Sequence, residues 1–160
     1  MARSGKKQAK IIAGVVLAVA LALNLLTFAF SVVRYYGDGM TPTLKSGQVL
    51  VIDKIGSVSE GDIIAFYYNN KVLVRRVVST GGKQVEMDSA GTVSVNGAAL
   101  DEPYLESTTL GQCNLNFPYS VPAGHLFVLG DNRSVAMDSR LSEIGTVPED
   151  RVIGKVLFAV

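Results

Sequence analysis

The N-terminal part of the chain contains one long apolar segment. Residues 11–33 read IIAGVVLAVALALNLLTFAFSVV and carry no charged side chain. At about 1.5 Å per residue, a helix of this length crosses a hydrocarbon layer of roughly 30 Å. The pattern therefore predicts a transmembrane helix over residues 11–33. Its polar members Asn24 and Thr27 are expected to hydrogen-bond to the backbone or to take part in a helix–helix contact.

The flanks of this segment predict its orientation and its retention. Lys6, Lys7 and Lys10 precede it, and Arg34 follows it. The positive-inside rule then places a basic tail, residues 1–10, in the cytoplasm and residues 34–160 outside the membrane. A cleaved secretory signal is the alternative, but its apolar region has about 7–15 residues and ends in small residues of the A-x-A type. The longer run here, followed by RYYGDG, favours a retained single-pass anchor.

After Arg34 the apolar pattern changes to short runs rich in Val, Ile, Tyr and Phe, separated by Gly, Asn, Asp and Pro. Such runs are typical of strands. The turn signals Tyr68-Asn69-Asn70-Lys71 and Val95-Asn96-Gly97-Ala98 predict two hairpins. The fold class expected is all-β, a sheet or barrel-like body. The strands predicted are Val49–Ile55, Asp62–Tyr68, Lys71–Val78, Lys83–Met87, Thr92–Val95, His125–Leu129 and Arg151–Val160.

One region of the exported part breaks this pattern. Residues 101–120, DEPYLESTTLGQCNLNFPYS, are more polar and less periodic than their surroundings. We expect them to form a polar excursion from the β body rather than a part of its core.

Composition and charge restrict the function classes. The chain has 160 residues, of which 48% are hydrophobic and 18% charged, so it is not a disordered protein. Residues 35–160 carry 10 basic and 14 acidic side chains, a net charge of −4, which argues against a nucleic-acid partner. Cys113 and His125 are the single cysteine and histidine, which excludes an internal disulfide and any site built on several of these ligands. No metal or cofactor is expected.

Three short stretches carry the most specific signal: GDGMTPTL at Gly37–Leu44, VRRVV at Val74–Val78 and GDNRSVAMDSR at Gly130–Arg140. With an N-terminal anchor in front, the chain resembles the type I signal peptidases of Gram-positive bacteria. These membrane-anchored proteases remove signal peptides from exported proteins with a serine–lysine dyad. The resemblance continues through the stretches Val93–Leu105 (VSVNGAALDEPYL), Val121–Arg133 (VPAGHLFVLGDNR) and Ile153–Val156 (IGKV).

At three positions the chain departs from what the resemblance implies. The residue before M-x-P-T is the nucleophilic serine in that family, and here it is Gly39. The first basic residue of the second stretch is the lysine general base, and here it is Arg75. A serine that supports the lysine amine commonly stands two residues before D-S-R, and here that position is Ala136.

These departures predict negligible peptidase activity. Glycine has no side-chain atom that could attack a carbonyl. Arginine keeps its proton at a pKa of about 12.5 or more, so it cannot act as the base. A buried Arg75 is also expected to need a carboxylate or several carbonyls as partners. Rescue by the hydroxyls of Thr41 or Thr43, or by an Asp38–Asp138 acid pair, is an alternative that we do not favour. Another alternative is that Gly39 and Arg75 were introduced by mutation in order to trap a substrate.

The resemblance implies that further residues frame the site without doing chemistry. Asp38, Met40 and Pro42 belong to the segment that lines the substrate groove. The loop residues Asp131, Asn132, Arg133, Asp138, Ser139 and Arg140 are expected to shape the site through charge-assisted hydrogen bonds and backbone capping.

Three functions are compatible with this sequence. The first is an inactive binding protein whose anchor contacts the membrane lipid. It holds an extended peptide of an exported protein by strand addition. Resemblance to accessory proteins of Gram-positive pilus assembly would make that peptide part of a pilin, with a sortase nearby. The second is an active signal peptidase that uses unusual residues or acts with a partner subunit. The third is a structural β domain tethered to the membrane.

Overall fold

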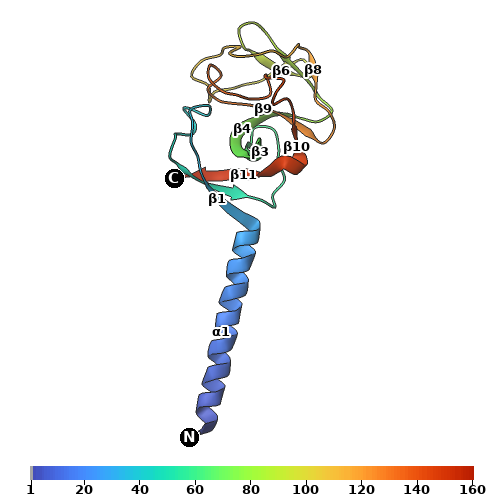
Figure 1. Ribbon diagram of the computed structural model, residues 1–160. Helices are drawn as coiled ribbons and strands as arrows, with labels where there is room; N and C mark the ends of the chain where they lie inside the picture. Colours follow the sequence, from blue (N-terminus) through green and yellow to red (C-terminus); the bar gives the residue numbers. More distant parts are fainter. Residues whose placement is uncertain (1) are drawn as a thin grey trace.

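The computed structural model describes residues 2–160. The side chains of residues 2–7 and 9 lie outside this description, and with them the charges predicted for Arg3, Lys6 and Lys7 of the tail. Helix α1 (Ala2–Ala29) projects from a β body that contains all other elements of the described chain (Figure 1).

Within α1, the segment Lys10–Ala29 has a mean hydropathy of 2.6 and is not buried against the body. It is therefore long and apolar enough to span a membrane. Asn24 Nδ2 donates to the Ala20 carbonyl at 2.8 Å, and Thr27 Oγ1 donates to the Asn24 carbonyl at 2.9 Å. The backbone bonding expected for these two residues is confirmed.

The helix ends earlier than the apolar pattern predicts. It stops at Ala29, and Phe30–Arg34 form strand β1, which pairs antiparallel with β2 (Val49–Asp53). The backbone N–H of Lys54 donates to the Ala29 carbonyl, and its Nζ donates to the Thr27 carbonyl, both at 2.8 Å. These bonds satisfy carbonyls that a helix end leaves free. The prediction of a helix to residue 33 was therefore wrong by four residues, since 33 − 29 = 4.

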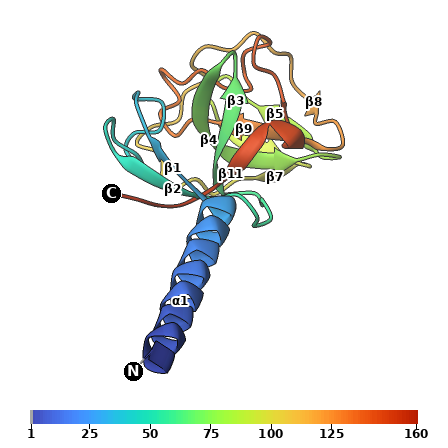
Figure 2. The same ribbon diagram turned by 60° about the horizontal axis from the view of Figure 1, so that its bottom comes forward.

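Two antiparallel sheets make up the body. The larger has the strand order β1-β2-β11-β3-β4-β9-β10, and the smaller has the order β7-β6-β5-β8. Strands β1, β2 and β11 lie beside the end of α1 (Figure 2), whereas β6 and β8 lie at the end of the body away from the helix (Figure 1). The remaining elements are β3 (Ile63–Tyr68), β4 (Lys71–Thr80), β5 (Gln84–Met87), β6 (Val93–Val95), β7 (Ala98–Ala99), β8 (Tyr119–Ser120), β9 (His125–Leu129), β10 (Val147–Pro148), a 3-10 turn η1 (Glu149–Arg151) and β11 (Val152–Ala159).

All seven predicted strands are present, and both predicted hairpin turns are confirmed. Asn69, Asn70 and Asn96 have φ values of 44°, 61° and 51°, the left-handed conformation that Asn tolerates in tight turns. Four strands, β1, β7, β8 and β10, were not predicted.

The predicted separation of residues 101–120 from the core is wrong. Most of this segment lacks regular structure, but its apolar members pack on the buried cluster between the two sheets. Phe117 and Tyr119 lie with their ring centroids 6.3 and 5.8 Å from that of the buried Phe127. The apolar residues of this segment are spaced irregularly among polar ones, so no strand or helix period in the sequence indicates that they are buried.

Candidate functional site

The loop after β1 is anchored by two buried apolar side chains. Met40 and Leu44 pack into a cluster formed by the large sheet, in which Leu50 and Ile52 are also fully buried. The hydroxyl of the buried Tyr35 accepts a hydrogen bond from the Met40 backbone N–H at 3.2 Å. These contacts fix Gly39 against the face of strand β4.

Arg75 of β4 lies directly beside Gly39. A Cβ added to Gly39 would be 3.2 Å from each terminal nitrogen of the Arg75 guanidinium and 3.3 Å from its Cζ. Two residues that are far apart in the sequence are thus brought into contact. The guanidinium fills the space that a side chain at position 39 would enter.

Carbonyl groups hold the Arg75 side chain, which is 6% exposed. Its Nε donates to the Met137 carbonyl at 2.8 Å, and Nη1 donates to the Val74 carbonyl at 2.5 Å. Among the residues that the structure describes, no carboxylate oxygen lies within the 4.0 Å of an ion pair with Arg75. Burial lowers the pKa of Arg75 from its ordinary value, and the nearby Asp138 partly opposes this change. Sequence reasoning expected carbonyl or carboxylate partners, and the partners are carbonyls.

Ala136 and the Gly39 carbonyl both pack closely against Gly130. A Cβ on Gly130 would be 2.2 Å from the Ala136 Cβ and 2.5 Å from the Gly39 carbonyl oxygen. The Asn132 N–H also donates to that carbonyl at 3.0 Å. Gly130 is therefore packed so closely that only glycine fits, and the loops that carry positions 39 and 136 touch.

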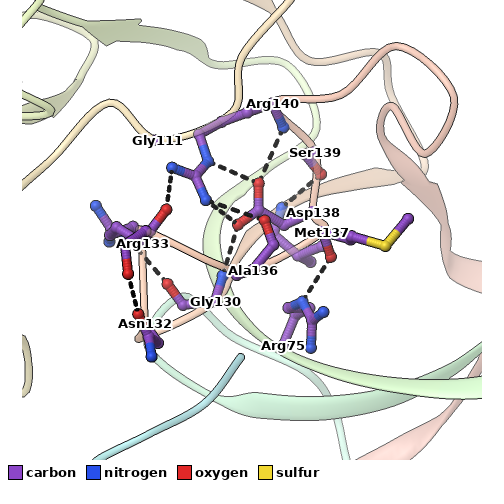
Figure 3. A network of polar contacts seen from close by, with 12 residues as sticks. Arg75, Gly111, Gly130, Asn132, Arg133, Ala136, Met137, Asp138, Ser139 and Arg140 are labelled. Carbon is purple, nitrogen blue, oxygen red and sulfur yellow. Dashed lines mark hydrogen bonds and ion pairs between the residues drawn. The ribbon is translucent and has the colours of Figure 1, made fainter. Parts of the chain in front are cut away.

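A fully buried ion pair organises the loop that follows β9 (Figure 3). Arg140 binds Asp138 with two bonds of 2.8 Å, and both side chains are 0% exposed. Arg140 also donates to the carbonyls of Leu110 and Arg133, while Gly130 N–H donates to Asp138 at 2.9 Å. Both oxygens of the Asp138 carboxylate therefore accept hydrogen bonds from groups of the same loop.

Two further arginine–carboxylate pairs surround the site. Arg76 binds Asp131 through both carboxylate oxygens, at 2.9 and 2.6 Å. Arg133 binds Glu102 with a shortest distance of 2.5 Å. Tyr104 connects the two pairs, because its hydroxyl donates to Glu102 at 2.8 Å and its ring lies 3.9 Å from the Arg76 Cζ. Burial and the neighbouring Glu102 carboxylate raise the pKa of Tyr104.

The hydroxyl groups of these loops are engaged in loop structure. Thr41 Oγ1 donates to the Asp38 carbonyl at 2.7 Å and accepts from Asn132, and Thr43 Oγ1 donates to Asp131 at 2.5 Å. Ser134 Oγ donates to Asn132 Oδ1 at 2.7 Å, whereas Ser139 Oγ accepts a hydrogen bond from Val128 N–H at 2.9 Å.

Asp38 and Pro42 are exposed on the Gly39 loop. Asp38 is on the surface whereas Asp138 is buried and paired with Arg140, so the two carboxylates have different environments. Within the described part of the chain, no group of three or more His, Cys, Asp or Glu side chains could hold a metal ion.

An open cleft of about 250 Å³ lies where these elements meet. Gly39 and Arg75 line it together with Tyr35 and side chains from β4 and the loop after β9, including Val135 and Met137. Burial raises the pKa of the Tyr35 hydroxyl, and its bond from Met40 N–H and the positive charge of Arg75 partly oppose this.

Comparison with known proteins decides the family. Residues 8–160 match the family model described as "Signal peptidase, peptidase S26". The chain belongs to this signal peptidase family. A family member with one exposed apolar helix of this length is a membrane-anchored protein.

Curated relatives of this signal peptidase family member carry the same name. Signal peptidase I of Bacillus amyloliquefaciens is 35% identical over 157 residues, 90% of this chain and 80% of the relative. Signal peptidase IB of Staphylococcus aureus (strain Mu50) is 34% identical over 165 residues, 89% and 84% of the two chains. The crystal structure of a signal peptidase I from Enterococcus faecalis superposes with a TM-score of 0.52 and 32% identity, covering 65% of this chain and 99% of the other.

Gly39, Arg75 and Ala136 were identified from the sequence. The structure places Arg75 beside Gly39, whereas Ala136 lies against Gly130, which also approaches the Gly39 carbonyl. The sequence analysis missed Tyr35, Glu102, Tyr104 and Met137 as residues of the site. Glu102 and Tyr104 lie in the DEPYL stretch, which carried part of the family resemblance and could have identified them. Tyr35 follows the alternating burial of β1, so a strand assigned there would have turned its ring inward.

Proposed function

We propose that this protein binds an extended segment of an exported protein in the Gly39–Arg75 cleft and does not cleave it. One observation carries the proposal: the guanidinium of Arg75 occupies the space beside Gly39 where a nucleophile and its base would have to meet. In a serine–lysine protease those two groups are a hydroxyl and a neutral amine. Here the first has no side chain and the second keeps its proton.

The other hydroxyls near the cleft are poorly placed to act as nucleophiles. The Thr41 hydroxyl donates to a backbone carbonyl, and the Thr43 hydroxyl donates to Asp131, a carboxylate already bonded to Arg76 through both oxygens. Tyr35 lines the cleft, but burial raises its pKa, which disfavours the phenolate. Of its two charged neighbours in the cleft, Arg75 donates protons and does not accept them, and the negative charge of Asp38 raises the pKa of Tyr35 further.

Strand β4 supports peptide binding. It pairs with β3 from Lys71 to Arg76, but its pairing with β9 begins only at Arg76. Residues 71–75 therefore have a strand neighbour on one side only, and Val72, Leu73 and Val74 of this free edge line the cleft. An extended peptide can add to such an edge through backbone hydrogen bonds, with specificity from side-chain pockets.

We further propose that the N-terminus lies in the cytoplasm and the β body outside the membrane. The lysines before the apolar helix support this orientation. The bound segment would then belong to an exported protein close to the membrane surface. A pilin as that protein, and a sortase as a further partner, rest on the resemblance alone; pilin and sortase genes beside the gene would support them.

A second candidate function is cleavage of signal peptides by non-standard residues. The names of the relatives favour it, since they are signal peptidases. The contacts of the cleft disfavour it, because they provide neither a free hydroxyl with a base nor a neutral amine.

One experiment separates the two functions. The full chain in detergent is incubated with a fluorescent peptide that contains an A-x-A signal-peptide site, and binding and cleavage are followed in the same sample. Saturable binding of the intact peptide is expected. Turnover well above background would establish the second function, and no binding at all would refute the proposed one.

A further inference from the structure

The charges around the cleft are not balanced. Three carboxylates of the buried network each have their own arginine: Asp131 binds Arg76, Glu102 binds Arg133 and Asp138 binds Arg140. The fourth arginine of this region, the buried Arg75, has only backbone carbonyls as partners among the described residues. An unpaired buried guanidinium is unfavourable until an anion reaches it.

The neighbouring carboxylates are not available to Arg75. Both oxygens of Asp131 are bonded to Arg76, and both oxygens of Asp138 are bonded to Arg140. These are the bidentate pairings that arginine favours, so exchange with Arg75 would leave another arginine without its carboxylate. Asp38 also lines the cleft, but it is exposed and forms no ion pair with Arg75 in the described part of the chain, so a bound molecule can supply the missing anion.

Arg75 is accessible from the cleft that we assign to peptide binding. It lines this cleft with Gly39, and the glycine places no side chain over the guanidinium. The free edge of β4 leads directly to it, because pairing with β9 begins at the next residue, Arg76. A peptide added along Val72–Val74 thus reaches Arg75 where the free edge stops.

From this placement we propose that Arg75 binds the terminal carboxylate of a peptide that lies along the β4 edge. The inference rests on the proposed function and names its ligand as a peptide with a free C-terminus. The carboxylate and the guanidinium form charge-assisted hydrogen bonds, and a backbone amide at the same place cannot supply the negative charge.

The test measures the affinity of the full chain in nanodiscs for three acetylated peptides by calorimetry. The first ends in Ala-Leu-Ala with a free carboxylate, the second is its C-terminal amide, and the third is an amide with an internal Glu. Arg75→Gln removes the positive charge, and Arg75→Lys keeps the charge but lacks the two-nitrogen guanidinium geometry. Arg151→Gln is a control at an exposed arginine on η1. Circular dichroism confirms that each variant is folded.

We expect the free acid to bind about tenfold or more tightly than its amide, since hydrogen bonds to charged groups have this strength. Arg75→Gln should abolish the difference, Arg75→Lys should reduce it, and Arg151→Gln should leave it unchanged. Equal affinity of acid and amide for the unsubstituted protein overturns the inference but leaves the proposed peptide binding intact. Tight binding of the Glu-containing amide alone overturns the chain-end assignment. No binding of any peptide refutes both proposals.

Discussion

The guanidinium of Arg75 fills the space beside Gly39, with its terminal nitrogens 3.2 Å from the point where a Cβ at Gly39 would lie. The two residues are therefore coupled: a larger side chain at position 39 needs a smaller or displaced one at position 75. Arg75 thereby presents a buried positive charge to the cleft, and the proposed function rests on this contact.

This coupling predicts that a protease can be restored only by combined substitution. Gly39→Ser together with Arg75→Lys and Ala136→Ser should give cleavage of an A-x-A peptide, because the serine gains a hydroxyl and the lysine can become neutral when buried. We expect a rate about 10²-fold or more above that of the unsubstituted protein, the contribution of a positioned general base. Mass spectrometry of the cut peptide is the measurement.

Gly39→Ser alone is the matched control. It should stay inactive, because the added side chain meets a protonated Arg75 at a close contact distance. Activity of this single variant would show that Arg75, or another group, serves as a base. A folded triple variant without cleavage would mean that the cleft has lost the geometry of a protease.

The buried pairs around the site should dominate its stability. Glu102→Gln leaves Arg133, whose side chain is 1% exposed, without its charge partner. We expect a loss of about 3–5 kcal/mol in the free energy of unfolding, the usual cost of breaking a buried ion pair on one side. Urea unfolding followed by circular dichroism measures it.

Glu60→Gln is the comparison for that variant. The Glu60–Lys83 pair has a similar distance, 2.8 Å, but its side chains are 35% and 38% exposed. Its loss should cost about 1 kcal/mol or less. Equal effects of the two substitutions would show that the Glu102–Arg133 pair is not buried in solution.

Alkaline titration should show tyrosines that ionise late. Burial raises the pKa values of Tyr35 and Tyr104 above the ordinary 10.0. Since the folded values are raised, the stability that these groups contribute is complete below about pH 10 and is lost as the pH rises through the folded values. Absorbance of the phenolate measures the ionisation. Tyr104→Phe should reduce the late component, and an unchanged titration would contradict the environment described for this ring.

Cys113 gives a direct test of topology. It is the single cysteine and lies half-buried in the β body. If the body is outside the membrane, a membrane-impermeant maleimide added to intact cells should label Cys113. A Cys113→Ser, Ser4→Cys variant should react only after the membrane is opened. The reverse pattern would place the N-terminus outside.

Local patterns predicted the parts of the fold that repeat regularly. The apolar run gave α1, and the Asn-rich turns gave the β3–β4 and β6–β7 hairpins. Strand β1 was missed because Phe30–Val33 is as apolar as the helix before it, and only its pairing with β2 and the bonds from Lys54 end the helix.

The site was predictable where a motif carried it and not where distant contacts formed it. Gly39 and Arg75 were identified from short stretches, but their contact depends on the packing of Met40 and Leu44 under the loop. The bond between Arg133 and Glu102 joins the loop after β9 to the irregular segment. No local period or spacing in the sequence indicates that pair.

A single-turnover assay tests most directly whether this protein cleaves amide bonds. The full chain in nanodiscs is mixed, in molar excess, with a labelled peptide that contains an A-x-A site. The products are analysed by mass spectrometry over a long incubation. Intact peptide that co-purifies with the protein is the expected result. A product cut after the A-x-A site, absent when the protein is omitted and still formed by a repurified preparation, would contradict the account.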